Sequence, residues 1–316
     1  MAELTYRKQK SDKQVTAESI FNNVYRPLQC LSHHLVKFTN HKPKLMPMIT
    51  KKKRNFADKM TISKAKIKYI RALEAKKHRD AEGVFVAEGP KVVGELLATM
   101  PAKLLVATPQ WQAPVTLHAS TELITVSDDE LQKLSFMRAP QQVMAVFPKF
   151  SKQGDVLKNC VETNDLTLML DGIQDPGNLG TIIRLADWFG IRHVVCSLDT
   201  ADVYNPKVVQ ATMGSIARVK VSYTPLEPLL DALPPSFPIY GTLLDGDNIY
   251  GQQLCAQGII VMGNEGKGLS TSVRQRVNHK LLIPHFATGE HRAESLNVAI
   301  ATAIVCAEFR RQGAQR

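Results

Sequence analysis

The sequence predicts an α/β protein with a small N-terminal α/β domain, followed by a larger domain built on a mostly parallel sheet. From residue 166 onward, short and nearly continuous apolar segments alternate with helical patterns, which is typical of parallel strands covered on both faces. Residues 60–150 show the same alternation on a smaller scale. At 316 residues the chain is long enough to build a core for each domain.

The first 59 residues differ from the rest in charge and pattern. They hold 13 Lys and Arg against 4 Asp and Glu, within a chain of net charge +11, and they show no sustained periodicity. We predict a basic, largely unstructured extension over 1–59 and a folded domain that begins at Met60. One hypothesis is that the extension is an upstream translated segment. Positive clusters attract polyanions such as RNA or DNA, although a solvated face or tail also explains a charge run.

Residues 60–150 are predicted to form the small domain. Its first element is a basic amphipathic helix over 64–79, with Ile67, Ile70 and Leu73 on one face. Strands are predicted at 84–89, 104–108, 123–127 and 143–147, and further helices at 90–100 and 127–135, the last capped by Ser127. Residues 151–165 are polar and weakly patterned, which predicts a linker.

Residues 166–316 are predicted to form the larger domain. Its strands are expected at 166–172, 193–197, 217–222, 238–246, 258–263 and 280–284, and its helices at 181–190, 205–215, 225–233, 270–278 and 295–312. Arginines in the last helical turn and Gly313 beyond it are ordinary stop signals for a helix.

Composition excludes several classes of protein. The five cysteines are odd in number and widely spread, without a CxxC pair, which argues against a disulfide framework or a zinc site and fits a reducing cytoplasm. No apolar run approaches the length of a membrane span, and the polar N-terminus does not resemble a secretory signal. We therefore expect a cytoplasmic protein with no bound metal.

Three strand–loop–helix junctions carry small polar residues. The first, DPGNLGTIIRLADWFG (175–190), contains Asn178 and Arg184, the second, VMGNEGKGLS (261–270), contains Glu265, and the third runs through 283–304. Open α/β sheets bind ligands at such ends of strands, although glycine turns also serve backbone geometry alone. A dinucleotide-dependent oxidoreductase is one alternative, but GxGxxG is missing, as is the GK[ST] of a P-loop.

The three junctions, in this order, resemble the motifs of the SpoU (TrmH) family of RNA ribose 2′-O-methyltransferases. Residues 62–150 also resemble the accessory RNA-binding domain of that family, which is L30e-like, that is, similar to a small RNA-binding ribosomal protein. The resemblance implies a knotted (trefoil) SPOUT domain over 166–316, S-adenosylmethionine as methyl donor, and a homodimer. It also implies RNA as the partner, with ribosomal RNA preferred over transfer RNA, and it excludes DNA, which lacks the 2′-hydroxyl.

The resemblance also implies a set of site residues. Catalytic positions are Asn178, Arg184, Glu265, Ser295 and Asn297, and the donor pocket is formed by Thr242, Leu243, Met262, Gly263, Ile283 and Leu296. RNA contacts are expected from the basic helix, at Lys64, Lys66, Lys68, Arg71, Lys76, Lys77 and Arg79. One departure is the longer loop over 285–293, with His285 where the family often has methionine.

Methyl transfer to a ribose hydroxyl depends on positioning the 2′-oxygen in line with the methyl carbon. A guanidinium stays protonated, so Arg184 is expected to clamp an RNA phosphate and stabilise developing negative charge, not to remove the proton. The base is left open between a phosphate oxygen and a water. The alternative function is a catalytically inactive RNA-binding ribosome-assembly factor of the same fold. Trp188 and Cys306 are expected to be packing residues, and His285 and His291 surface residues.

Overall fold

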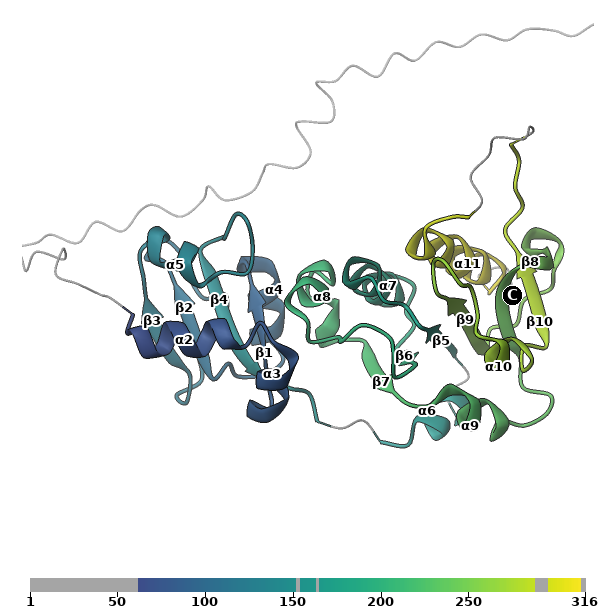
Figure 1. The fold of residues 1–316 in the computed structure, drawn as a ribbon, viewed down its shortest axis with the longest axis horizontal. Coiled ribbons are helices and arrows are strands. Elements are labelled where there is room, and N and C mark those ends of the chain that lie inside the picture. The colour runs from purple at the N-terminus through teal and green to yellow at the C-terminus, as the bar shows by residue number, and fades with distance from the viewer. Residues whose placement is uncertain (1–61, 152–153, 163–164, 288–294, 314–316) are drawn as a thin grey trace, which may run out of the picture. The chain divides into compact units, whose positions relative to one another are not determined.

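The computed structural model of the protein describes residues 62–151, 154–162, 165–287 and 295–313 (Figure 1). The predicted extension over 1–59, Met60 and His291 lie outside the described residues. The described strands form a four-stranded sheet in the first half of the chain and a six-stranded sheet in the second. Within the described ranges, no helix is both long and apolar enough to cross a membrane.

The first sheet and its helices form an α/β arrangement over residues 64–148, called the small domain below. Its elements are α2 (Lys64–Ala72), α3 (Lys76–Glu82), β1 (Val84–Glu88), α4 (Pro90–Leu97), β2 (Leu104–Ala107), β3 (Glu122–Thr125), α5 (Asp128–Leu134) and β4 (Val143–Pro148). The strand order is β1-β4-β2-β3, and only β2 and β3 run parallel. The predicted cap of α5 is confirmed, because Ser127 and Glu130 form a reciprocal capping box.

The single basic helix predicted over 64–79 is wrong, because the chain forms two helices there. Between α2 and α3 the chain turns, and Leu73 is buried in the core of the small domain. The Arg79 guanidinium binds the backbone of this turn: it donates hydrogen bonds to the carbonyl oxygens of Leu73 at 2.9 Å and Glu74 at 2.5 Å. A buried arginine therefore stabilises the break between the two helices.

The second half of the chain alternates strands and helices. Its elements are α6 (Val156–Glu162), β5 (Leu166–Asp171), α7 (Pro176–Trp188), β6 (His193–Cys196), α8 (Pro206–Ala211), η1 (Ser215–Ala217), β7 (Lys220–Tyr223), α9 (Leu226–Asp231), β8 (Ile239–Asn248), η2 (Ile249–Gly251), β9 (Gly258–Gly263), α10 (Thr271–Arg274), β10 (His279–Leu282) and α11 (Val298–Gly313). The predicted linker over 151–165 contains α6, whose Cys160 is buried beside Met169, so that prediction needs correction.

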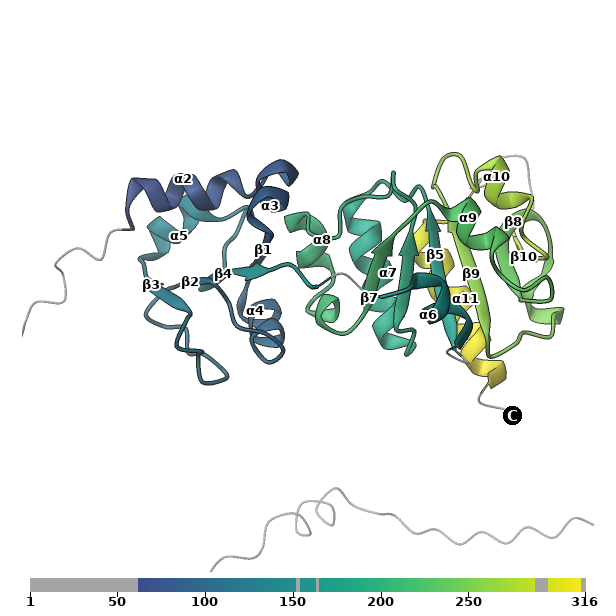
Figure 2. The same ribbon diagram turned by 90° about the horizontal axis from the view of Figure 1, so that it is seen from below.

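The six-stranded sheet has the order β10-β8-β9-β5-β6-β7, and all its strand pairs are parallel, which confirms the predicted sheet (Figure 2). From β5 the chain continues to β6 and β7 on one side, whereas β8, β9 and β10 lie on the other. The boundary between β5 and β9 is thus the point where the strand order reverses, which is where such sheets bind ligands. A knotted path of the chain stays a prediction.

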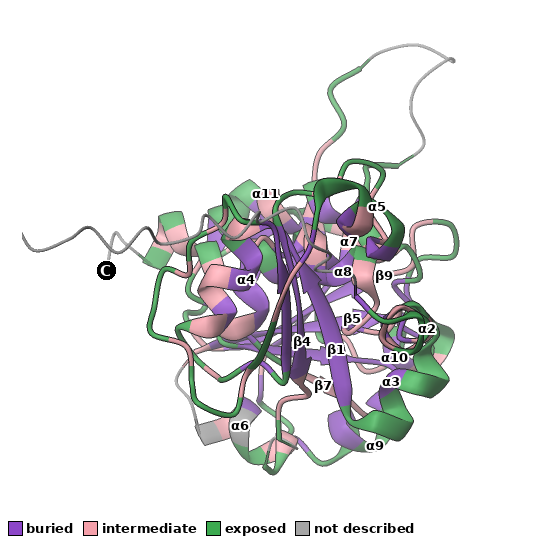
Figure 3. Cartoon of the chain, turned by 90° about the vertical axis from the view of Figure 1, so that its left-hand side faces the viewer, coloured by how far each residue is buried: buried purple, intermediate pink, exposed green. Residues whose placement is uncertain are grey.

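The main apolar core extends from the small domain into the second half of the chain. It includes Phe85 of β1 and Val208 of α8, both fully buried. Figure 3 shows β1 as buried along its length. Helices α7 and α8 pack so closely that a Cβ atom on Gly180 would lie only 2.5 Å from the Cβ of Ala211. Glycine at position 180 therefore serves the packing of two helices, and not a turn.

Candidate active site

The first loop of the site joins β5 to α7. Asp175 caps α7 by accepting a hydrogen bond from the backbone N–H of Asn178 at 2.8 Å, and Pro176 occupies the first helical position. The helix consequently begins at Pro176, five residues before the predicted start at Thr181. This early start places Asn178 in the first turn of the helix, next to the carboxyl end of β5.

The side chain of Asn178 connects all three predicted motifs. Its Nδ2 donates to Glu265 Oε1 at 2.7 Å, and its Oδ1 accepts from Nδ2 of Asn297 at 2.9 Å. Asn297 in turn accepts hydrogen bonds from the N–H groups of Ala299 and Ile300, so it caps the start of α11. Three predicted site residues, each from a different loop, are thus brought together through a single amide.

A second set of hydrogen bonds fixes the loop after β9 against the loop after β5. Asp171 and Gly263 are register partners in the β5–β9 pair, so the two loops begin side by side. Asn264 donates from Nδ2 to the Gly172 carbonyl at 2.7 Å, and its Oδ1 accepts from the N–H groups of Gly266 and Lys267. Asn264 lies in the second junction, VMGNEGKGLS (261–270), but it is not among the predicted site residues. Its signal was an asparagine directly after a strand in a glycine-rich turn.

The Arg184 side chain is exposed on α7, six residues after Asn178. It makes no ion pair or hydrogen bond to any residue that the structure describes, so its charge is available to an anionic ligand. Ser295 is likewise exposed and bonds to no other described residue. Trp188, at the end of the same helix, is 83% exposed, and its predicted packing role is wrong.

The predicted donor-pocket residues lie on neighbouring strands and the segments that follow them. The β8–β9 register pairs Gly241 with Val261, so Thr242 and Met262 lie opposite one another, and the Thr242 hydroxyl donates to the Val261 carbonyl at 3.2 Å. Leu243 and Met262 are buried, whereas Leu296 is half exposed just before α11. Ile283 follows β10 directly and packs against the main core. None of the six residues carries a charge, and four of them, Leu243, Met262, Ile283 and Leu296, have large apolar side chains.

Gly263 also shapes this region. A Cβ atom at this position would lie 2.4 Å from the backbone carbon of Gly268, so the loop after β9 folds back too tightly for any larger residue. Position 263 therefore requires glycine, because the backbone of Gly268 and Leu269 fills the space that a side chain would take.

The predicted RNA-contact residues divide into three groups. Lys64, Lys68 and Lys77 are exposed and unpaired within the described part of the chain. Lys66 pairs with Glu122 at 2.7 Å, Lys76 with Asp80 at 2.6 Å, and the guanidinium of Arg71 lies 5.2 Å from the ring centroid of Phe136. The third group is Arg79 alone, for which the predicted RNA contact is wrong.

Arg79 cannot contact RNA in this structure because its side chain is buried. It is 1% exposed, and besides the two turn carbonyls it binds Asp202 at 2.7 Å. The basic pattern of the sequence could not separate this buried arginine from its exposed neighbours, since an ion pair to a residue 123 positions away decides its place.

The remaining candidates behave as predicted where the structure describes them. Cys306 is fully buried in α11, and burial raises the pKa of its thiol to about 12, so the thiol is inert at neutral pH. His285 is exposed. Among the described residues, no group of three or more His, Cys, Asp and Glu side chains is arranged to hold a metal ion.

Comparison with known proteins identifies the class. The profile of the SpoU rRNA Methylase family matches residues 165–307, and that of the MRM3-like substrate binding domain matches residues 64–145. The chain is 30% identical over 248 residues to a 23S rRNA (guanosine(2553)-2′-O)-methyltransferase of Bacillus subtilis, covering 78% of this chain and 96% of that protein. The fold and the three connected loops are therefore those of an RNA methylase of the SpoU type.

Solved structures agree with this class. A TrmH-family protein from Porphyromonas gingivalis matches with a TM-score of 0.70 and 40% identity over 80% of this chain and 99% of that one. An AdoMet-bound rRNA methyltransferase from Sinorhizobium meliloti matches with a TM-score of 0.67 and 29% identity over 79% and 96% of the two chains. The chain belongs to the SpoU rRNA methylase family.

Proposed function

We propose that this protein transfers a methyl group from S-adenosylmethionine to a ribose 2′-hydroxyl of ribosomal RNA. The observation that carries the proposal is the Asn178 amide, which binds Glu265 of the second loop and Asn297 of the third. That arrangement fixes three loops around one point at the carboxyl edge of the sheet. The names of its relatives, which include 23S rRNA 2′-O-methyltransferases, support the same reaction.

The donor pocket would be formed by Thr242, Leu243, Met262, Gly263, Ile283 and Leu296. The fit rests on two observations: these residues bring no charge, and Thr242, Leu243, Met262 and Gly263 lie on the adjacent strands β8 and β9. Apolar walls with backbone hydrogen-bonding groups suit a flat adenine ring and a ribose. When bound there, S-adenosylmethionine supplies an electrophilic methyl group on a positively charged sulfur.

Arg184 would act on the RNA. Its exposed guanidinium, unpaired within the described residues, suits a bidentate clamp on a phosphate, and the same charge stabilises negative charge that develops on the 2′-oxygen. A guanidinium does not accept a proton, so the 2′-proton passes to a phosphate oxygen or a water. Asn178, Glu265, Ser295 and Asn297 would position the ribose and hold the loops in register.

The small domain would bind the RNA away from the reacting ribose. Lys64, Lys68 and Lys77 are exposed and free to contact phosphates, while Lys66, Lys76 and Arg71 would have to exchange their present partners. Such phosphate contacts position a nucleic acid without reading its sequence. Large exposed apolar side chains at Leu244, Phe286 and Ile300 support a homodimer, in which a second copy covers them. The cytoplasm is the proposed location.

The test is transfer of tritiated methyl from S-adenosylmethionine to total RNA from a strain that lacks the protein, with the labelled ribose then mapped. Label on a ribosomal-RNA 2′-oxygen is the expected result. Bound S-adenosylmethionine without label would move the search to an RNA present only during ribosome assembly. Stoichiometric RNA binding with neither label nor S-adenosylmethionine binding would favour the assembly-factor alternative.

A further inference from the structure

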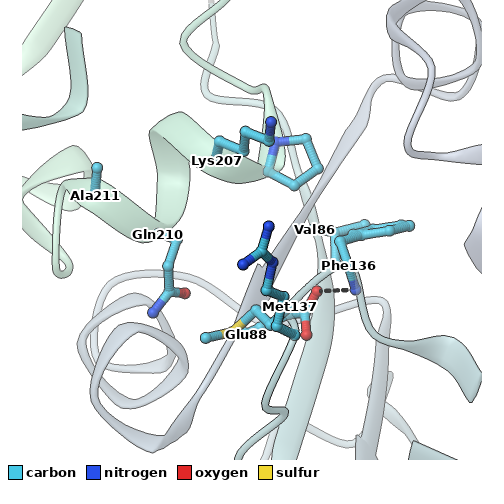
Figure 4. A pocket seen from close by; sticks show the side chains of 9 residues that line it. Val86, Glu88, Phe136, Met137, Lys207, Gln210 and Ala211 are labelled. Carbon is cyan, nitrogen blue, oxygen red and sulfur yellow. Dashed lines mark hydrogen bonds between the residues drawn. The ribbon is translucent and has the colours of Figure 1, made fainter. Parts of the chain in front are cut away.

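A pocket of about 340 Å³ lies between β1, the segment that follows α5, and α8 (Figure 4). None of the candidate active-site residues lines it. Its chemically distinctive lining residues are Glu88, Phe136, Arg138, Lys207 and Gln210, and the rest of its wall is mainly apolar. Its volume falls at the lower end of the range for ligand pockets, about 300–1,000 Å³. It therefore accommodates one nucleoside-sized group.

Gln210 lines this pocket, and its side chain carries an unpaired hydrogen-bonding group. Its Oε1 is shielded from solvent yet has no hydrogen-bond partner, and its amide nitrogen makes no hydrogen bond to any residue that the structure describes. Buried amides in proteins are rarely left unpaired, because the lost bonds to water are not replaced. A ligand that donates a hydrogen bond to Oε1 would supply the missing partner.

Glu88 adds acceptors to the same pocket. The residue is buried, and its carboxylate accepts hydrogen bonds from the Phe136 N–H at 2.8 Å and from the Ser135 hydroxyl. Burial raises the pKa of this carboxyl, and the nearby Arg71 opposes that effect. A carboxylate offers about four lone-pair directions, so two named donors leave capacity for a third.

Cations and an aromatic ring complete the set. Arg138 and Lys207 line the pocket and are exposed, so their charges are available to an anion. Phe136 contributes a ring against which a flat group can stack. These groups suit a nucleotide whose base carries an amino group. The acceptors would bind the amino group, the ring would stack on the base, and the two cations would bind the phosphate.

We propose that the pocket holds an unpaired, amino-bearing nucleotide of the substrate RNA, separate from the nucleotide that is methylated. This inference rests on the proposed function. RNA is favoured over a free nucleotide because Arg71, which lies over Phe136, belongs to α2, and the exposed Lys64 and Lys68 extend the positive surface along that helix. Because Gln210 and Glu88 offer hydrogen-bond acceptors, the pocket prefers bases that carry an amino group.

Cytidine and uridine oligomers test this preference, because the two bases differ chiefly in an amino group against a carbonyl. Fluorescence anisotropy with labelled ten-nucleotide C10 and U10 RNAs would measure binding by the full chain. We expect C10 to bind at least about fivefold more tightly, and Gln210→Leu to remove that preference while leaving U10 binding unchanged. Phe136→Leu should weaken both RNAs about tenfold through lost stacking.

Gln253→Leu is the matched control, because it makes the same replacement at an exposed glutamine that does not line the pocket, and it should change neither affinity. Each variant is checked for thermal stability and S-adenosylmethionine binding. Equal binding of C10 and U10 by the unaltered chain, or a C10 preference that survives Gln210→Leu, would overturn the pocket assignment. Competition by free CMP at the concentration of C10 would overturn the assignment to RNA.

The methyl-transfer assay is run in parallel, so the two proposals fail separately. Methyl transfer without a C10 preference would overturn the proposed nucleotide pocket and support the proposed reaction. A C10 preference lost in Gln210→Leu, together with no methyl transfer, supports the pocket and removes the proposed reaction.

Discussion

Asn178 donates a side-chain hydrogen bond to Glu265 across 2.7 Å, and this bond joins two loops that lie 87 residues apart in the sequence. The other end of the same amide accepts from Asn297, 119 residues away. An asparagine side chain can donate and accept at once, whereas a carboxylate only accepts. The choice of residue at 178 is therefore set by its two partners, one an acceptor and the other a donor.

Asn178→Asp should remove methyl transfer almost completely, by at least about 100-fold, the range found when a positioned group in an active site is lost. The new carboxylate would face that of Glu265 and repel it, so the loop after β9 would leave the loop after β5. Initial rates of tritium transfer to RNA measure the effect. Asn205→Asp is the control, since Asn205 caps α8 and aspartate caps a helix as well. A variant that keeps more than a tenth of the wild-type rate would contradict this role of Asn178.

Arg184→Ala should abolish methyl transfer while S-adenosylmethionine affinity stays nearly unchanged. The reason is that the guanidinium, which has no partner among the described side chains, is proposed to bind RNA and not the donor. Calorimetry for the donor and tritium transfer for the reaction separate the two steps. Arg192→Ala changes another exposed arginine close in sequence and should keep activity. Unchanged turnover in Arg184→Ala would refute the phosphate clamp.

The strands of the larger sheet were predictable because β5, β6 and β9 are buried on both faces. Such strands appear as continuous apolar runs, such as residues 166–170 and 258–262, and the structure confirms them with parallel pairing. The order of the strands was not predictable from these runs, since each would fit any interior position. The meeting of the three loops depends on that order, and only the family resemblance suggested it.

Long-range polar contacts account for what the sequence did not predict. Arg79 shares the spacing and charge of exposed neighbours, and only its pairing with Asp202 makes it buried. Long-range apolar packing has the same effect on α6: the segment 151–165 is largely polar, but Cys160 belongs to the same buried apolar cluster as Met169 of β5. A local sequence pattern predicts which side of a helix or strand is apolar. It does not predict which residue, more than a hundred positions away, will pair with a given side chain.

The buried Arg79–Asp202 pair predicts a large loss of stability when one partner is removed. Their side chains are 2% and 15% exposed, so Asp202→Ala leaves the arginine charge buried and uncompensated. Breaking such a pair costs about 3–5 kcal/mol, which we expect as a lower free energy of unfolding in urea. The double variant Arg79→Met, Asp202→Leu removes both charges and should recover a large part of this loss.

The exposed pair Lys66–Glu122 provides the comparison. Its side chains are 30% and 52% exposed, so Lys66→Ala should change the free energy of unfolding by no more than about 1 kcal/mol. Equal effects of Asp202→Ala and Lys66→Ala would show that the buried pair contributes no more than a surface one.

His193 predicts a dependence of stability on pH. Burial on β6 lowers the pKa of its imidazole below the ordinary 6.5, with repulsion from Lys220 and Arg192 adding to the effect. The unfolded chain therefore binds a proton more readily than the folded one below pH 6.5. Stability is complete above pH 6.5 and falls as the pH drops toward the lower pKa of the folded protein. Urea unfolding of wild type and His193→Gln at pH 8 and pH 5.5 tests this. The wild type should lose more stability between the two values, and identical losses would exclude His193 as a source.

A chain that begins at Met60 should fold and remain active. A chain that begins at Met60 keeps all the described helices and strands and the apolar core that they enclose, which begins at Ile62. We expect the Tm to change by less than about 2 °C, which corresponds to less than about 1 kcal/mol in a chain of this size. Methyl-transfer rates should also match those of the full chain. A chain that begins at Lys76 is the control: it lacks α2 and with it Ile70 and Leu73, both buried in the core, and should unfold at a clearly lower temperature. If the chain from Met60 lost activity while keeping its Tm, residues 1–59 would have a part in binding the substrate.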